Sequence, residues 1–448
     1  MRDNPTWRVG HRRHMVVAAE SYVLQRVRAI DPVLQCDRTV DVWVERGSIQ
    51  TIEEHPISVP DGAEVVDASR WVLGPGLVDL YVHTGEPGYE QRETFESLGR
   101  AALAGGFTQV ALLPSTDPVV DTLAQLERVQ ARQQTEQTPL WLPLAAMTVG
   151  CRSESMTEFA ELVEAGAIAF CDDAPLPALP LLRRVLDYLA PLQKTALLWP
   201  RHAELAGLGV MHEGEHSLQL GLPGIPASAE TVAVAAVLEM LTPQSAPVHL
   251  MRLSQARSLE LVDRARQQDL PVSASTSWMH LLLCDRDIET YHYDPALHLY
   301  APLGTDLDRE ALIDAVKSST LSAIATDHSP YTFEEKTVPF AVAPPGAIGL
   351  ELALPLLWQH LVTPGKLSAL NLWTALSAHP ARVLNLKSPS LQKGPEANCI
   401  LFDPERTWVV NANTLQSQSS ATPWWGQTLT GKVLGCWLNG SWMATDKG

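Results

Sequence analysis

Side chains that can do chemistry stand at the points of the sequence where short apolar runs end. Histidine and aspartate in such places can bind or transfer a proton, or bind a metal ion, when several of them gather together. A single one more often makes a structural hydrogen bond, whereas several at one edge of a sheet indicate a functional site. The positions that close the runs are Tyr81 to His83, Asp172 and Asp173, Trp199, Arg252, and Asp327 with His328.

Eight short apolar runs carry these positions. They alternate with segments whose apolar residues recur every three or four positions, which is the period of a helix. Strands that alternate with helices predict a parallel sheet covered on both faces. Eight such units before about residue 380 favour a closed (β/α)8 barrel, with the chemistry at the carboxyl ends of the strands. An open doubly wound sheet is the alternative, although no G-x-G-x-x-G motif follows the first run. The runs are residues 76–81, 108–113, 141–147, 167–171, 195–199, 247–251, 271–275 and 321–326.

Both ends of the chain consist of short β-rich runs separated by turn residues. Residues 21–74 are broken by Asp-Pro, Arg-Gly and Asp-Gly pairs, and an Asn-Gly pair predicts a hairpin near the other end. We expect residues 21–74 and 381–448 to form one small β-domain, with separate terminal hairpins as the alternative. Residues 1–20 are expected to be a disordered tail, and the protein could begin at Met15.

The composition argues against several classes of protein. Asp and Glu outnumber Lys and Arg by 51 to 33, for a net charge of −18. Such a chain lacks the basic footprint that a nucleic acid or an anionic membrane requires. An apolar run of about 18 residues is missing, so no transmembrane helix is expected. The six cysteines are scattered without a C-x-x-C pair, which favours a reducing cytoplasm over a disulfide framework or a zinc ribbon.

Several blocks of this sequence resemble the bacterial dihydroorotases of the amidohydrolase superfamily. The resemblance implies a TIM-like amidohydrolase barrel over residues 75–380 and a β-sandwich built from residues 21–74 and 381–448, which agrees with the pattern of runs. It also implies a hydrolase of cyclic amides, which interconverts carbamoyl aspartate and dihydroorotate in pyrimidine synthesis. The similar blocks are residues 75–121, 165–175, 209–230, 256–265, 280–283, 324–336 and 343–357.

The resemblance also implies two zinc ions, which imidazoles and carboxylates hold and which make hydroxide from a bridging water. The metal ligands that remain are His83, Asp173 and Asp327, and Asp327 would be the catalytic proton shuttle as well. The three other ligand positions carry Tyr81, Trp199 and Arg252 in place of histidine. Three of six ligands are therefore lost, and His202, three residues beyond Trp199, could replace one of them.

The substrate-binding positions of the family have changed too. Gly85 stands where the family has an arginine that pairs with the substrate carboxylate, and Tyr300 and Tyr331 replace an asparagine and a histidine. Charge-assisted contacts of this kind contribute about 1.5–3 kcal/mol each, so little specific affinity for dihydroorotate is expected. The loop Pro344, Pro345, Gly346 flanks the substrate in the family and survives here, either as part of a live pocket or as a packing element.

Arg252 bears most directly on the metal. A guanidinium carries a permanent charge, so it would repel zinc and pair with carboxylates. We expect it to take over the ion's charge and pair with Asp173 and Asp327 in a buried salt-bridge cluster, because leaving those carboxylates unpaired would cost about 3–5 kcal/mol. No cofactor is then expected, and zinc is expected only if His83, Asp173 and Asp327 retain an ion.

Three functions follow from these observations. The leading hypothesis is a non-catalytic dihydroorotase homologue, because metal-less relatives in the family act as structural partners of aspartate carbamoyltransferase. The alternatives are an active hydrolase of dihydroorotate, or of a hydantoin- or allantoin-like substrate, with a reduced metal site, and a small-molecule sensor. The leading hypothesis implies a cytoplasmic oligomer with neither a nucleic-acid nor a membrane partner. Thirteen tryptophans, Trp424 and Trp425 among them, could mark a contact surface or fill the core.

Overall fold

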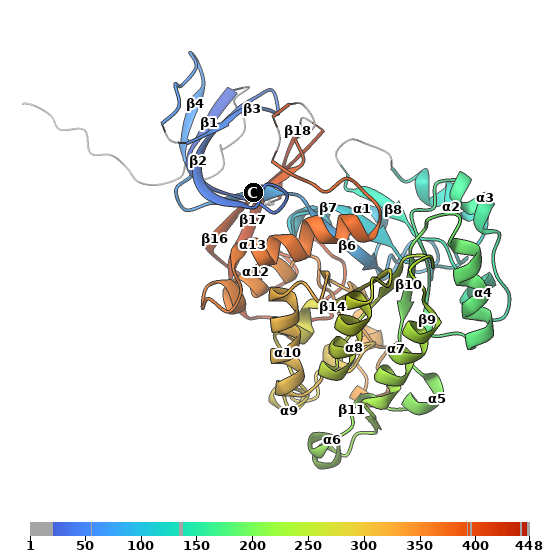
Figure 1. Ribbon diagram of the computed structural model, residues 1–448. Helices are drawn as coiled ribbons and strands as arrows, with labels where there is room; N and C mark the ends of the chain where they lie inside the picture. The colour runs from blue at the N-terminus through green and yellow to red at the C-terminus, as the bar shows by residue number, and fades with distance from the viewer. Residues whose placement is uncertain are drawn as a thin grey trace, which may run out of the picture.

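The computed structural model describes residues 21–54, 56–133, 138–391, 393–394, 397–439 and 441–445. The strands from the two ends of the chain lie together beside a barrel that the middle of the chain forms (Figure 1). The tail predicted for residues 1–20, with Met15, falls outside the described residues.

Eight parallel strands of the described chain form the barrel wall. Each of the eight predicted apolar runs overlaps one of them. They pair in the order β6-β7-β8 and β9-β10-β13-β14-β15, and the neighbours within both groups run parallel. The strands are β6 (Leu77–Val82), β7 (Phe107–Leu112), β8 (Leu140–Pro143), β9 (Phe170–Pro175), β10 (Ala196–Trp199), β13 (Val248–Leu250), β14 (Val272–Ser277) and β15 (Ala323–Ala325).

Two seams join these groups of strands into a closed wall. At the first seam the backbone N–H of Cys171 donates to the carbonyl of Ala145 at 2.9 Å. At the second seam the backbone N–H of His83 donates to the carbonyl of His328 at 2.9 Å. The buried carboxylate of Asp79 on β6 supports this second seam by accepting hydrogen bonds from the backbone N–H and the hydroxyl of Thr326. Burial raises the pKa of Asp79 to about 7.

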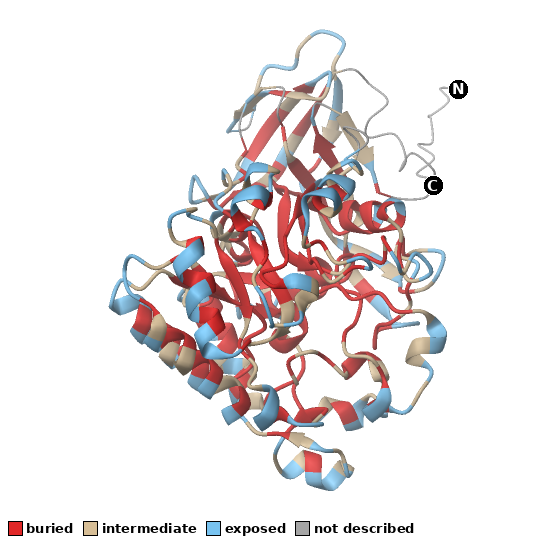
Figure 2. Cartoon of the chain, turned by 90° about the vertical axis from the view of Figure 1, so that its right-hand side faces the viewer, coloured by how far each residue is buried: buried red, intermediate tan, exposed pale blue. Residues whose placement is uncertain are grey.

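Helices cover the outside of the wall and turn their buried sides toward it (Figure 2). In α4, for example, Leu182, Val185 and Leu189 are buried while Arg183 and Arg184 are exposed, as expected for an amphipathic helix. Within the described ranges no helix is long and apolar enough to cross a membrane. The helices that follow barrel strands are α1 (Phe95–Ala104), α2 (Leu123–Gln130), α3 (Phe159–Glu164), α4 (Leu179–Leu189), α7 (Ser228–Met240), α8 (Ala256–Gln267) and α10 (Asp306–Lys317).

Shorter elements lie between and after these helices. A small excursion after β10 holds two short helices and a pair of two-residue strands, and the chain returns toward the sandwich through the last three helices. These elements are α5 (Ala203–Ala206), β11 (Met211–His212), α6 (Glu215–Leu220), β12 (Gly224–Ile225), α9 (Asp287–Thr290), α11 (Phe333–Lys336), α12 (Ala353–Leu357), α13 (Ala369–Trp373) and α14 (His379–Val383).

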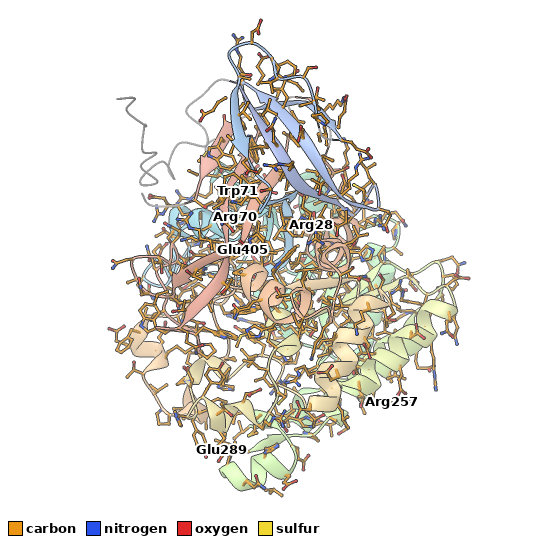
Figure 3. The ribbon with its side chains drawn as sticks, turned by 90° about the vertical axis from the view of Figure 1, so that its left-hand side faces the viewer. Arg28, Arg70, Trp71, Arg257, Glu289 and Glu405 are labelled. Atoms are coloured by element: carbon orange, nitrogen blue, oxygen red, sulfur yellow. The ribbon has the colours of Figure 1, made fainter. Side chains whose placement is uncertain are left out.

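The remaining strands form one sheet of eight, in which β5 and β16 join the two ends of the chain in antiparallel register. Side chains reinforce this junction: the Trp71 indole donates to Asp403 at 3.3 Å, and Arg70 lies 3.8 Å from Glu405 (Figure 3). The two ends therefore share a sheet, while the domain boundaries at residues 74 and 381 stay a prediction. The strands are β1 (Ser21–Asp31), β2 (Cys36–Glu45), β3 (Ser48–Glu53), β4 (Glu64–Asp67), β5 (Val72–Pro75), β16 (Cys399–Val409), β17 (Thr428–Leu438) and β18 (Ser441–Ala444).

Candidate functional site

The guanidinium of Arg252 lies between two carboxylates at the carboxyl end of the barrel. Its Nη1 is 2.8 Å from Oδ1 of Asp173. Its Nη2 and Nε bind Asp327 in a bidentate manner, at 2.7 Å from Oδ1 and 2.9 Å from Oδ2. The side chain of Arg252 is 0% exposed, and those of Asp173 and Asp327 are 4% and 10% exposed. Both ion pairs expected from the sequence are therefore present, and they are screened from water.

The two carboxylates stabilise the charged form of Arg252. Burial alone would lower the pKa of Arg252, but the carboxylates of Asp327 and Asp173 raise it well above its ordinary value. The hydroxyl of Ser115 donates to Oδ2 of Asp173 at 2.9 Å, so both carboxylate oxygens of Asp173 have a partner. One guanidinium offsets one of the two carboxylate charges, so the cluster keeps a formal charge of −1 when the fourth ionisable group, His83, is uncharged.

His83 completes the cluster as a neutral ring. Its Nδ1 lies 3.5 Å from Oδ2 of Asp173, and its Nε2 lies 3.5 Å from Nη2 of Arg252. Burial lowers the pKa of His83, and the Arg252 charge acts in the same direction against Asp173. The imidazole also stacks on Tyr300, with ring centroids 5.2 Å apart and an angle of 8° between the planes.

Three aromatic rings surround the guanidinium. The Arg252 Cζ atom lies 5.4 Å from the ring centre of Tyr81, 5.2 Å from that of Trp199 and 4.3 Å from that of Tyr300. Aromatic faces attract a cation at such distances, and more strongly in the absence of water. Tyr81 and Trp199, which the resemblance aligns with two metal-binding histidines, thus both contact the arginine that it aligns with the third.

The three charged residues of the cluster share an unusual backbone conformation. Asp173, Arg252 and Asp327 have φ angles of 50°, 59° and 49°, in the left-handed region that residues other than glycine seldom adopt. Such conformations cost about 1–3 kcal/mol each and persist where the surrounding structure holds them, often at functional sites. The positive φ angles at the three strand ends therefore direct these side chains toward one another.

The residues of this site do not fit a pair of zinc ions. In the described part of the chain, no three His, Cys, Asp or Glu side chains are grouped so that they could hold a metal ion. The Arg252 guanidinium fills the space among His83, Asp173 and Asp327, and its permanent charge opposes a divalent cation. Trp199 has only an N–H donor to offer. The residues of this site therefore do not suit a metal-bound hydroxide as nucleophile.

Little space remains beside the cluster for a substrate. The cavity that Trp199, Arg201, Gln255 and Tyr300 help to line has a volume of about 20 Å³, which is room for about one water molecule. A cyclic amide with six ring atoms does not fit there without movement of the surrounding loops.

The family's substrate-binding positions help to close this space. A Cβ atom on Gly85 would lie 2.3 Å from the carbonyl oxygen of Glu93, so the loop has no room for a side chain where the family has its arginine. The Tyr331 hydroxyl donates to the carbonyl of Pro345 at 3.0 Å and lies 3.4 Å from the hydroxyl of Tyr300. The loop from Pro344 to Gly346 is thus held next to Tyr300 by Tyr331, which the resemblance aligns with a histidine.

Other predicted residues lie outside the cluster. His202 caps α5, where its Nδ1 accepts the backbone N–H of Leu205 at 3.4 Å. Asp172 accepts hydrogen bonds from the backbone N–H and hydroxyl of Thr148 at 2.9 and 2.8 Å. His328 accepts the backbone N–H of Gly349 at 3.2 Å. These three side chains have structural roles, and His202 does not replace a lost imidazole.

A row of polar side chains across the barrel interior was not predicted. His249, fully buried on β13, contacts the hydroxyls of Ser273 and Ser275 through its two ring nitrogens, each at 2.8 Å. Ser275 lies 3.0 Å from the hydroxyl of Tyr81, which accepts the backbone N–H of Arg252 at 3.2 Å. Burial lowers the pKa of His249 to about 3, so this row is uncharged at neutral pH. The only signal in the sequence was the alternation of these polar residues within apolar runs.

Comparisons with known proteins place this chain among the dihydroorotases and their relatives. The family model described as "Dihydro-orotase-like" matches residues 70–254. The chain is 40% identical to a "probable dihydroorotase-like protein" of Synechocystis sp., over 93% of this chain and 99% of that protein. It is 36% identical to a dihydroorotase of Pelobacter propionicus, over 92% and 96% of the two chains.

Among solved structures, the L-hydantoinase (dihydropyrimidinase) of Arthrobacter aurescens superposes with a TM-score of 0.81 at 19% identity, over 94% of this chain and 96% of that one. This likeness confirms the predicted fold, a TIM-like amidohydrolase barrel with a β-sandwich from the two ends of the chain. Taken with the sequence matches, it shows that the chain belongs to the dihydroorotase-like family.

Proposed function

We propose that this protein is a non-catalytic dihydroorotase homologue that serves pyrimidine synthesis as a structural partner of aspartate carbamoyltransferase. The observation that carries the first part is the Arg252 cluster, in which an arginine side chain lies among Asp173, Asp327 and His83. Arg252 supplies a positive charge to the two carboxylates but cannot activate a water molecule as a metal ion does.

The neighbouring groups do not supply another catalyst. Asp327, which aligns with the family's proton shuttle, binds Arg252 through both oxygens, so both oxygens are engaged in an ion pair. His83 is flanked by Asp173 and Arg252 and stacked on Tyr300. Hydrolysis of an amide needs a nucleophile, a base and room for the substrate, and a cavity of about 20 Å³ leaves room for little more than the nucleophile.

The proposed partner rests on the family resemblance. Large apolar side chains that are strongly exposed support a contact surface on this protein. Leu208 is 92% exposed and Leu218, on α6, is 84% exposed, and Figure 1 shows α6 at the far end of the molecule from the β-sandwich. Burial of two leucines would stabilise an association by roughly 1.5–3 kcal/mol for each side chain.

Turnover measurements test the absence of catalysis. Purified protein, with and without added zinc, is assayed for hydrolysis of dihydroorotate and for the reverse cyclisation of carbamoyl aspartate. We expect no turnover above the uncatalysed reaction in either direction. Zinc-dependent turnover at rates typical of enzymes, roughly 1–1000 per second, would contradict the proposal.

Sedimentation velocity tests the partnership. The protein is mixed with the aspartate carbamoyltransferase of the same organism, and we expect one complex larger than either component. The double variant L208D/L218D should weaken this complex, whereas the control L34D should not. Leu34 is 61% exposed but follows β1 in the sandwich, away from α6 (Figure 1). Components that sediment separately at every concentration would reject the partnership and leave the conclusion on catalysis intact.

A further inference from the structure

A second cavity opens at the opposite end of the barrel. Residues that precede or begin the strands line it, such as Thr195 before β10, Val248 in β13 and Ser322 before β15. Its volume is about 600 Å³, which lies within the range of roughly 300–1000 Å³ that is usual for sites of small molecules. The amino end of this barrel therefore has space for a ligand that the carboxyl end lacks.

Basic groups line this cavity although the protein as a whole is acidic. Arg266 of α8, and His379 and Arg382 of α14, face it, and Asp269 is the acidic residue among the lining groups. The chain carries a net charge of −18, so a cavity with two arginines and one carboxylate departs from the rest of the molecule. Burial lowers the pKa of His379, and the positive charges of Arg382 and Arg266 lower it further because they disfavour a protonated ring.

The two arginines are held differently. Arg266 donates to the carbonyl of Thr320 at 3.2 Å and to that of Ser319, which fixes its guanidinium at the edge of the cavity. For Arg382, the described residues provide neither an ion pair nor a hydrogen bond to the guanidinium. It is an exposed cation beside a large cavity. Ser322 and Asn385 are further polar residues of the lining, whereas the Ser273 hydroxyl there already bonds His249.

We propose that this cavity is a binding site for a small organic anion with at least two negative charges, such as a sugar phosphate or a dicarboxylate. Planar guanidinium groups bind phosphate and carboxylate oxygens in pairs, and the hydroxyls of the lining suit the remaining polar atoms of such a molecule. The proposal is independent of the function proposed above, since it concerns the other end of the barrel and neither the Arg252 cluster nor the exposed leucines.

Isothermal titration of the intact protein with ribose 5-phosphate and with succinate tests the proposal. At about 0.1 M salt, where long-range attraction is screened, we expect one of the two probes to bind with one site per chain. R382Q should weaken that binding about tenfold. N385D should weaken it as well, because it places a negative charge in the cavity, and aspartate tolerates the φ of 55° found at residue 385.

The matched control is R184Q, which removes the same charge from an exposed position on α4 and should change the affinity less than twofold. Binding of the phosphate alone or of the dicarboxylate alone would identify the anion. The proposal is overturned if neither probe binds the native protein at millimolar concentration, if R382Q and N385D both bind as the native protein does, or if R184Q weakens binding as much as they do.

Discussion

The two ends of the barrel have opposite properties. At the carboxyl end, charged side chains and aromatic rings fill the centre, and a cavity of about 20 Å³ remains beside them. At the amino end, a cavity of about 600 Å³ is open, and Arg382 there has no charged partner within the described residues. The end where barrel enzymes place their chemistry has become a packed core, and the opposite end has the free space and the free charge.

If the protein is non-catalytic, as we propose, this contrast is that of a site lost while its framework persists. The strand ends still hold Asp173, Arg252 and Asp327 with positive φ angles. Two carboxylates that would be costly to bury unpaired are each paired with the same arginine. On the proposed alignment, an arginine in place of a ligand offsets part of the carboxylate charge but does not supply the chemistry of a metal ion.

Removal of Arg252, at the carboxyl end, should lower the free energy of unfolding more than any of the changes below. R252M leaves Asp173 and Asp327 buried without a counter-charge, so we expect the free energy of unfolding to fall by about 3–5 kcal/mol. Urea titration followed by circular dichroism measures it. The control R184M, at an exposed position, should change stability by less than about 0.5 kcal/mol. Equal losses in the two variants would mean that the cluster is not a stabilising unit.

Acidification should test the polar row inside the barrel. The pKa of His249 is about 3 in the folded protein against an ordinary value of 6.5. Between these values the unfolded chain binds a proton that the native chain does not, so stability is lost as the pH falls below 6.5. From pH 7 to pH 5 the native protein should lose on the order of 2 kcal/mol more than H249Q does. The same loss in both proteins would show that His249 is not the group responsible.

Removal of a single hydroxyl should have a smaller effect at the carboxyl end. Ser115 donates to Asp173 at 2.9 Å, and a hydrogen bond to a charged group contributes about 1.5–3 kcal/mol when the acceptor is left without another donor. Because Arg252 still pairs with Asp173, we expect S115A to lose about 1.5 kcal/mol, at the lower end of that range. Thermal unfolding measures the change, and a neutral result would indicate that Arg252 alone suffices for Asp173.

The smallest effect is expected at the amino end. R382Q removes an exposed side chain without a partner in the described structure, so the stability of the ligand-free protein should change by less than about 0.5 kcal/mol. A loss above about 1 kcal/mol in urea titration would mean that Arg382 supports the fold and that the two ends are less different than we infer.

The sequence was sufficient to predict the barrel, because each of the eight wall strands overlaps an apolar run. It was also sufficient to predict that Arg252 pairs with Asp173 and Asp327, since the family resemblance aligned the three strand ends. It could not predict that the loop at Gly85 closes on Glu93, which depends on backbone positions alone. The row through His249 was missed because a polar residue within an apolar run does not reveal its partners.

The cavity at the amino end was missed for a similar reason. Its lining comes from segments as far apart as Thr195, Arg266 and Arg382, none of which forms a motif. The space among such segments depends on how the strands begin and where α14 packs. Neither hydrophobic periodicity nor charge patterning specifies that spacing.

Zinc content tests the central claim, that Arg252 stands in place of the family's metal, most directly. The native protein and the variant Y81H/W199H/R252H are dialysed against zinc and then against metal-free buffer, and zinc per chain is measured by mass spectrometry. We expect the native protein to retain far less than one ion per chain and the variant to retain more. Close to two ions per chain in the native protein would contradict the account.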